Sequence, residues 1–113
     1  MRAFHVLQKS SAVKLFAIFL VYLMLGVGCA GPKPLEELVL ARVALEAAKD
    51  SGASTITPGL WHKAEEEYRK GQKAMQGNYN QDAKEFFDRA RVFAEKAENA
   101  TRLKKFTSGD GFI

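Results

Sequence analysis

Chemically reactive side chains are scarce in this chain of 113 residues, which has one cysteine, two histidines and three prolines. One cysteine cannot form a disulfide within the chain, and Cys29 and His62 are too few to make a metal site. No glycine-rich phosphate loop, nucleophile elbow or convergent pair of carboxylates occurs in the sequence. We therefore expect no cofactor, no metal site and no enzymatic activity.

A sustained basic surface is also lacking, although the chain carries 17 basic against 13 acidic residues. Three of the basic residues, Arg2, Lys9 and Lys14, precede a hydrophobic run near the amino terminus. Residues 29–113 then keep a net charge of only +1. Binding to nucleic acid requires many basic groups on one face to neutralise phosphates. We expect no nucleic-acid partner and assign the surplus positive charge to export.

The amino-terminal segment has the three parts of an export signal in the required order. A positively charged start is followed by thirteen uncharged residues from Leu15 to Val27. This run is shorter than the roughly 20 apolar residues that a membrane-spanning helix needs. Small residues follow it, among them Gly28 and Ala30 on either side of the cysteine. We predict a signal peptide over residues 1–28, removed by cleavage between Gly28 and Cys29.

Val27, Gly28 and Cys29 resemble the end of the lipobox of bacterial lipoprotein precursors. That motif has Leu, Val or Ile three residues before the cysteine, where this chain has Gly26, with Leu25 one place too early. The resemblance implies acylation of Cys29, with palmitate among the chains, and two acyl chains suffice for stable anchoring. Because Ala30 and not Asp follows the cysteine, it further implies anchoring at the periplasmic face of the outer membrane.

Two other fates of the segment stay open. Ordinary signal cleavage after Ala30 would use Gly28 and Ala30 as its pair of small residues. Alternatively, an uncut segment over about Val13 to Gly31 would anchor the protein in the inner membrane.

The rest of the chain predicts an all-α fold, a small antiparallel three-helix bundle that follows the signal helix. We expect the lipidated cysteine and a tether at residues 29–33, three helices within residues 34–105, and a flexible tail at residues 106–113. The first helix stops at Ser51-Gly52, and the second runs from a Thr57 cap and Pro58 to Gly77. The third begins at a cap supplied by Asn78 or Asn80 and continues to about Lys105.

Apolar residues at three- and four-residue spacing indicate one buried face on each of these helices. In the first helix they are Leu35, Leu38, Val39, Leu45 and Ala48, with Ala41, Ala44 and Ala47 beside them. In the second they are Leu60, Trp61, Ala64, Tyr68, Gly71 and Met75. In the third they are Ala83, Phe86, Phe87, Ala90, Phe93, Ala94 and Ala97.

Charged residues are expected on the exposed faces of the same helices. Acid precedes base at four-residue spacing in Glu66–Lys70, Glu85–Arg89 and Glu98–Arg102, an order that stabilises a helix. Glu65, Glu66 and Glu67 are consecutive and therefore point around the helix, so we predict a solvated face. Lys104 and Lys105, at the end of the third helix, suit the negative end of its dipole.

The second and third helices resemble one tetratricopeptide repeat. Trp61, Ala64, Glu65 and Tyr68 have the spacing of the first helix of such a repeat. The residues that resemble its second helix are Gly77, Tyr79, Ala83, Phe87 and Ala90. Only one such unit is present, and a single repeat cannot bury its own face, so a repeat array is excluded. We expect a helical hairpin similar to the repeat unit.

A wider resemblance runs from about Leu38 to Leu103. It rests on Ala41, Ala44, Ala47, Ala48, Ser51-Gly52-Ala53, Thr57-Pro58, Trp61, Ala64, Gly77-Asn78-Tyr79, Ala83, Ala90, Ala94 and Ala97. This pattern resembles the alanine-rich helical domain of unknown function 4398. The resemblance implies a bacterial envelope lipoprotein and supplies no catalytic residue.

The aromatic residues of the second and third helices are either core or part of a groove that accepts a partner helix. The candidate groove residues are Trp61, Tyr68, Phe86, Phe87 and Phe93. A domain of this size has a marginal core, so docking on an envelope protein or self-association would stabilise it. We predict a membrane-anchored structural or adaptor protein. The alternative is a small enzyme or ligand-binding module that uses a pocket near Trp61, His62 and Tyr68.

Overall fold

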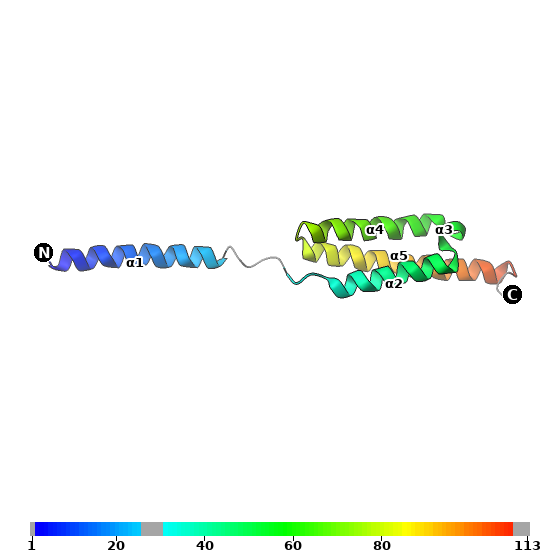
Figure 1. The fold of residues 1–113 in the computed structure, drawn as a ribbon, viewed down its shortest axis with the longest axis horizontal. Coiled ribbons are helices and arrows are strands. Elements are labelled where there is room, and N and C mark those ends of the chain that lie inside the picture. Colours follow the sequence, from blue (N-terminus) through cyan, green and yellow to red (C-terminus); the bar gives the residue numbers. More distant parts are fainter. Residues whose placement is uncertain (1, 26–30, 110–113) are drawn as a thin grey trace. The chain divides into compact units, whose positions relative to one another are not determined.

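A computed structural model describes residues 2–25 and 31–109 of the chain, which divides into two units, residues 1–30 and 31–113. The first unit contains helix α1, Arg2–Leu25. The second contains helices α2, α3, α4 and α5, which are drawn in Figure 1. Their bounds are Leu35–Ser51, Ala53–Ile56, Pro58–Gln76 and Asn80–Thr107. No strand occurs in residues 2–25 and 31–109, which confirms the predicted all-α class.

Helix α1 contains most of the predicted signal peptide. Its side chains from Val13 to Met24 are exposed, including Leu15, Phe16, Ile18 and Phe19. Among the residues that the structure describes, no helix is both long enough and apolar enough to cross a membrane. The predicted cleavage and lipidation residues, Gly28 and Cys29, lie outside the described residues.

The end of helix α2 follows the sequence prediction. Gly52 adopts a left-handed backbone with φ of 93°, which a glycine reaches without strain. Its N–H donates to the carbonyls of Ala48 and Lys49, so two groups at the end of the helix are paired. The predicted stop at Ser51-Gly52 is confirmed.

The start of helix α4 corrects a predicted cap. Thr57 occupies the residue before Pro58, but its side chain makes no capping hydrogen bond. Its hydroxyl instead lies 2.8 Å from Thr101 Oγ1 and 3.2 Å from the Ala97 carbonyl oxygen, both on α5. The backbone between α2 and α4 is already organised by the short helix α3, so Thr57 is free to join two helices.

The turn between α4 and α5 corrects the predicted cap of α5. Neither Asn78 nor Asn80 caps α5, whose first flanking residue is Tyr79, with no side-chain cap. The left-handed residue of the turn is Asn78, with φ of 60°, and not Gly77, with φ of −83°. A Cβ on Gly77 would lie 2.9 Å from Cδ2 of Tyr79, so this glycine makes room for an aromatic ring.

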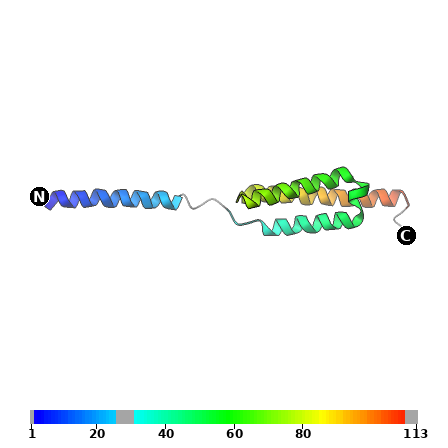
Figure 2. The same ribbon diagram turned by 45° about the horizontal axis from the view of Figure 1, so that its top comes forward.

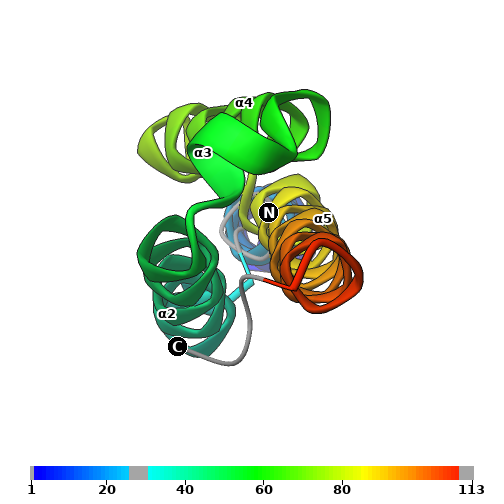
Figure 3. The same ribbon diagram turned by 90° about the vertical axis from the view of Figure 1, so that its right-hand side faces the viewer.

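Helices α2, α4 and α5 pack side by side. Helix α4 runs antiparallel to both α2 and α5, and α3 bridges the end of α2 to the start of α4 (Figures 1 and 2). Viewed along the helices, α2, α4 and α5 occupy three corners around a shared interior (Figure 3). The turn from α4 to α5 and the start of α2 therefore lie at one end of this unit, and α3 lies toward the other.

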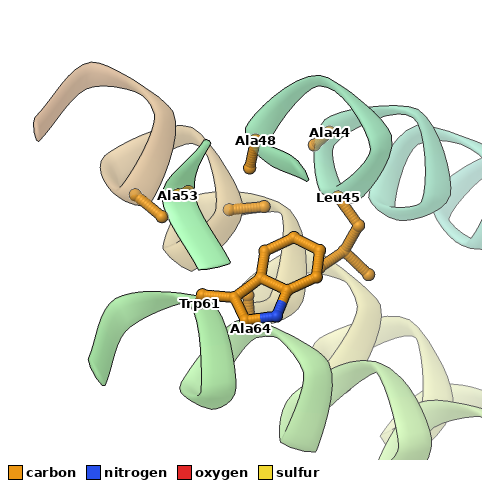
Figure 4. Packing of buried hydrophobic residues seen from close by; sticks show 8 residues of the cluster. Ala44, Leu45, Ala48, Ala53, Trp61 and Ala64 are labelled. Atoms are coloured by element: carbon orange, nitrogen blue, oxygen red, sulfur yellow. The ribbon is translucent and has the colours of Figure 1, made fainter. Parts of the chain in front are cut away.

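The buried residues form two groups along the helices. The Trp61 cluster consists of Ala44, Leu45, Ala48, Ala53, Trp61, Ala64, Ala94 and Ala97, and Figure 4 shows its indole ring beside the alanines of α2. The Phe87 cluster consists of Ala41, Ala83, Phe87 and Ala90. Tyr68 packs against both clusters. Alanine is the most frequent core residue, so the backbones of the three helices approach closely.

The buried face of α2 differs from the predicted stripe. Ala41, Ala44, Leu45 and Ala48 are buried, whereas Leu35 and Val39 are exposed. The predicted stripe chose the largest apolar residues. The structure places the small residues inward because helices can only come close together where side chains are short.

Helix α5 continues to Thr107, two residues beyond the predicted end at Lys105 and into the predicted tail. The hydroxyl of Thr107 bonds the carbonyls of Leu103 and Lys104, and that of Ser108 bonds the carbonyl of Lys105. The Lys104 carbonyl also accepts the backbone N–H of Ser108, whereas the N–H of Gly109 donates to Phe106, so the Ser108 hydroxyl supplies a donor to Lys105 at the end of the helix. Thr101, outside the predicted face, is fully buried in the same helix.

Candidate functional site

The five candidate groove residues do not share one open surface. Phe87 is 0 % exposed and lies inside the core, and Trp61 is 9 % exposed. Tyr68 is half-buried, and its ring centroid lies 5.5 Å from that of Phe87. A residue with no exposed surface cannot contact a partner unless the helices separate. The prediction is corrected for Phe87, which is a packing residue.

Phe86 and Phe93 are half-buried on helix α5, where cationic side chains cover their rings. The guanidinium of Arg89 lies 4.8 Å from the ring centroid of Phe86. The ammonium groups of Lys63 and Lys96 lie 5.0 Å and 5.7 Å from the ring centroid of Phe93. Such cation–π contacts shield the aromatic faces from water, so neither ring is an open apolar patch.

A hollow of about 290 Å³ lies between α2 and α4, beside the exposed edge of Trp61. It is lined by Arg42, Leu45, Glu46 and Lys49 from α2 and by Trp61, Glu65, Tyr68 and Arg69 from α4. Two aromatic rings and one leucine thus meet three cationic and two acidic side chains. This combination suits a peptide segment with an apolar or aromatic residue and adjacent charges. We take the hollow as the candidate binding site.

Two of the residues that line the hollow are joined by a hydrogen bond. Arg42 Nε donates to the hydroxyl of Tyr68 at 3.2 Å, which joins α2 to α4 at its floor. His62 does not line it, because this side chain is 73 % exposed and faces Glu65 at 3.5 Å. The predicted trio of Trp61, His62 and Tyr68 is therefore not assembled. In residues 2–25 and 31–109, no group of three or more metal-binding side chains occurs.

One glutamate departs from the predicted solvated face. Glu67 is only 9 % exposed, and its carboxylate accepts hydrogen bonds from Arg89 Nε at 2.8 Å and Lys70 Nζ at 3.1 Å. Burial by itself raises the pKa of Glu67, but these two cationic donors outweigh it and lower the pKa. The signal was available in the sequence, since Glu67 lies three residues after Ala64 and four before Gly71 on the buried face.

The predicted helix-stabilising ion pairs are present on the surface. Lys70 Nζ lies 2.9 Å from Glu66, and Arg102 Nη2 lies 2.7 Å from Glu98. Arg89 approaches Glu85 at 4.0 Å while its Nε binds Glu67. Exposed pairs of this kind contribute about 0.2–1 kcal/mol each, so they support the helices and define no site.

The basic residues at the end of α5 bind helix ends within the same unit. Lys104 Nζ donates to the carbonyl of Ile56 at 3.2 Å, and Lys105 Nζ donates to the carbonyl of Ser51. These acceptors close α3 and α2, respectively. The two lysines thus act on the negative ends of neighbouring helices, whereas the sequence predicted an effect on α5 itself.

Asn80, which sequence reasoning treated only as a cap, joins the tether to the helices. It is buried, and its Nδ2 donates to the carbonyl of Gly31 at 2.5 Å. Pro34 is buried as well. Residues 31–34 therefore pack on the helical unit, and no local sequence pattern could reveal a contact across 49 residues.

The family described as Domain of unknown function (DUF4398) matches residues 36–107. The chain belongs to the DUF4398 family. The match begins in the first turn of α2 and ends at the last residue of α5, so the DUF4398 region is the packed set of helices that contains the hollow and the Glu67 ion pairs. No curated protein and no solved structure matches the chain at a significant level.

Proposed function

We propose that this DUF4398 protein is a bacterial envelope lipoprotein, acylated at Cys29 and anchored at the periplasmic face of the outer membrane. Its helical unit then acts as a non-catalytic structural or adaptor module. The observation that carries the proposal is the order of charged start, thirteen-residue apolar run and small residues directly before the single cysteine. The exposed apolar side chains of α1 support it, because they suit a segment that functions in a membrane and is then removed.

We further propose that α2, α4 and α5 form a free-standing antiparallel three-helix bundle, in which α4 and α5 are the hairpin similar to a tetratricopeptide repeat. The close contact of Gly71 with Phe87 supports this arrangement. A Cβ built on Gly71 would lie 2.7 Å from two ring carbons of Phe87, so the Phe87 ring packs directly against the backbone of α4. Small residues opposite large aromatic ones are the packing on which such a hairpin depends.

The anchor is tested by intact mass and membrane fractionation of the wild type beside Cys29→Ser. We expect the wild type to begin at Cys29, to carry the added mass of acyl chains and to fractionate with the outer membrane. The Cys29→Ser protein should lack that mass. A product that begins after Ala30 without lipid would show ordinary secretion, and one that keeps Met1 would show an uncut anchor; either result overturns the proposal.

A second substitution tests the weak position of the motif. Gly26→Leu restores the leucine that the lipobox has three residues before the cysteine. We expect faster conversion of precursor to lipidated product in a pulse-chase experiment, with the same final mass. Ile18→Leu, within the apolar run, is the matched control and should leave the rate unchanged. A slower conversion of Gly26→Leu would contradict cleavage between Gly28 and Cys29.

The adaptor role assigns the hollow between α2 and α4 to the partner. A photo-crosslinking amino acid at Arg69, which lines the hollow, should capture a discrete envelope protein or a second copy of the chain. The same amino acid at Glu95, an exposed residue of α5 outside the hollow, is the matched control. Equal capture at both positions would remove the hollow as the partner site. Loss of a measurable turnover in both His62→Ala and Tyr68→Phe, with helicity retained, would instead favour an enzyme.

A further inference from the structure

The backbone next to the acylation residue is fixed to one end of the helical unit. Asn80 stands at the start of α5 and is only 6 % exposed. Its Nδ2 donates to the Gly31 carbonyl, and Pro34 is buried three residues later. The segment after Gly31 is therefore not a flexible linker. The position of Gly31 fixes the position of the helical unit that contains Asn80.

The carboxamide oxygen of Asn80, Oδ1, can accept a further hydrogen bond from this segment. Asn80 Oδ1 is buried and has no hydrogen-bond partner among the described residues. A buried amide oxygen without a donor is costly, and a backbone N–H is the usual donor for it. Oδ1 belongs to the same carboxamide whose Nδ2 binds Gly31, so the side chain can hydrogen-bond the tether through both of its polar atoms.

The turn that contains Asn80 has no charged residue. The six residues from Gln76 to Gln81 are Gln, Gly, Asn, Tyr, Asn and Gln. Tyr79 in this turn is 66 % exposed, and Leu35, at the start of α2, is 60 % exposed at the same end (Figure 1). At the opposite end of α5, Arg102, Lys104 and Lys105 lie within about one helical turn.

We propose that this end of the helical unit, formed by the turn from Gln76 to Gln81 together with Leu35, is a contact surface for the phospholipid bilayer. The proposal rests on acylation of Cys29. Gly31 is the second residue after Cys29, and two residues of chain span at most about 7 Å. Acyl chains on Cys29 therefore bring the end that binds Gly31 to the headgroups, where an exposed tyrosine is favoured. Charged residues flank this surface, among them Lys33, Glu36 and Asp82, and all three are exposed.

The orientation can be measured with labels at the two ends of α5. The full, acylated protein would carry Gln81→Cys or Thr107→Cys, each with the same thiol-linked fluorophore. Both residues are exposed. The proteins would be reconstituted in vesicles of phosphatidylethanolamine and phosphatidylglycerol that contain a lipid with a nitroxide in its headgroup. The 26 residues between the two labels correspond to about 39 Å of helix. We expect strong quenching at residue 81 and none at residue 107.

The role of Asn80 is tested in the same vesicles. Asn80→Ala combined with Gln81→Cys should lose quenching at residue 81, because the helical unit is released from the tether while the anchor stays. Gln76→Ala, in the same turn, is the control and should keep it. If Asn80→Ala lowers the melting temperature below the working range, the comparison of residues 81 and 107 decides by itself.

The outcomes separate this inference from the proposed function. Equal quenching at both positions, or stronger quenching at residue 107, in a protein of confirmed lipidated mass would overturn the membrane-contact surface and leave the lipoprotein intact. Absence of lipid mass on Cys29 would overturn the lipoprotein and this surface with it.

Discussion

Each of the two core clusters consists mainly of alanines around one aromatic ring, but the two rings differ in exposure. The Phe87 cluster surrounds a ring that is wholly inside, and Gly71 and three alanines make room for it. The Trp61 cluster holds six alanines and Leu45, and its ring lies at the edge, where the hollow between α2 and α4 begins. A fully buried ring contributes only to packing. A ring at the edge serves packing and leaves a surface for contact, so we place the candidate site at Trp61.

The two clusters also lie toward opposite ends of the helical unit. The Phe87 cluster lies toward the turn between α4 and α5, where Asn80 holds the tether. The Trp61 cluster lies toward α3, where hydrogen bonds from Thr57, Lys104 and Lys105 join the helix ends. The end near the turn between α4 and α5 is thus held by the packing of Phe87 against Gly71. The end near α3 is held by hydrogen bonds between helix ends.

Phe87→Ala should have the largest effect on stability. Removing a fully buried ring lowers the free energy of unfolding by about 3–5 kcal/mol, because the alanines around it cannot fill the cavity. Urea denaturation followed by circular dichroism would measure the loss. Phe86→Ala, which removes a half-buried ring under Arg89, is the control and should cost clearly less. Equal losses would show that the Phe87 cluster is not the closed core described here.

Gly71→Ala should destabilise the protein by about 1–3 kcal/mol although alanine is the better helix former. The added Cβ would meet the Phe87 ring at 2.7 Å, so the two helices must move apart. Gly59→Ala is the matched control in the same helix, since nothing lies within 4 Å of the new Cβ, and it should be neutral or stabilising. A stabilising Gly71→Ala would contradict the close approach of α4 and α5. The double variant with Phe87→Leu should recover part of the loss.

Thr57→Val should cost about 1–3 kcal/mol by leaving Thr101 Oγ1 and the Ala97 carbonyl without their partner in a buried place. Thr57→Ser keeps the hydroxyl and should retain most of the stability. Thermal unfolding of both variants would distinguish this bond between helices from simple helix capping. A capping role predicts that Thr57→Asp, which restores a good cap, is tolerated. The buried bond predicts that Thr57→Asp is worse than Thr57→Val.

The smallest expected effect is a pH dependence that arises from Glu67. Its pKa is lowered in the folded protein, so its ion pairs stabilise the fold fully above the unfolded value of about 4.3. This contribution is lost as the pH falls through the lower folded pKa. Urea midpoints measured from neutral to acid pH should therefore fall less steeply in Glu67→Gln than in the wild type. Glu66→Gln, at an exposed pair with Lys70, should keep the wild-type slope.

Sequence reasoning worked where one helix decides the outcome. The stops at Ser51-Gly52 and at the end of α4, the pairs such as Glu98–Arg102 and the alanine face of α5 all follow from local periodicity and from what glycine and charge do within a helix. It failed where the partner helix decides. Leu35 and Val39 fit an apolar stripe but are exposed, because only the neighbouring helix fixes which sector of a surface is covered. Glu67 was assigned to the solvated face by its charge, although its spacing from Ala64 and Gly71 places it on the buried face.

The sequence by itself determined the helical class, the DUF4398 family pattern and the signal-like segment that ends at Cys29, since each depends on composition and short-range spacing. Only the tertiary structure decided that Phe87 is core while Trp61 borders a hollow, that Thr57 bonds α5 and that Asn80 holds Gly31. These contacts join residues that are 16 to 49 positions apart in the chain. No periodicity within one helix specifies which residue of another helix it will meet. Their physical origin is the close packing of alanine-rich faces, which allows only one register between the helices.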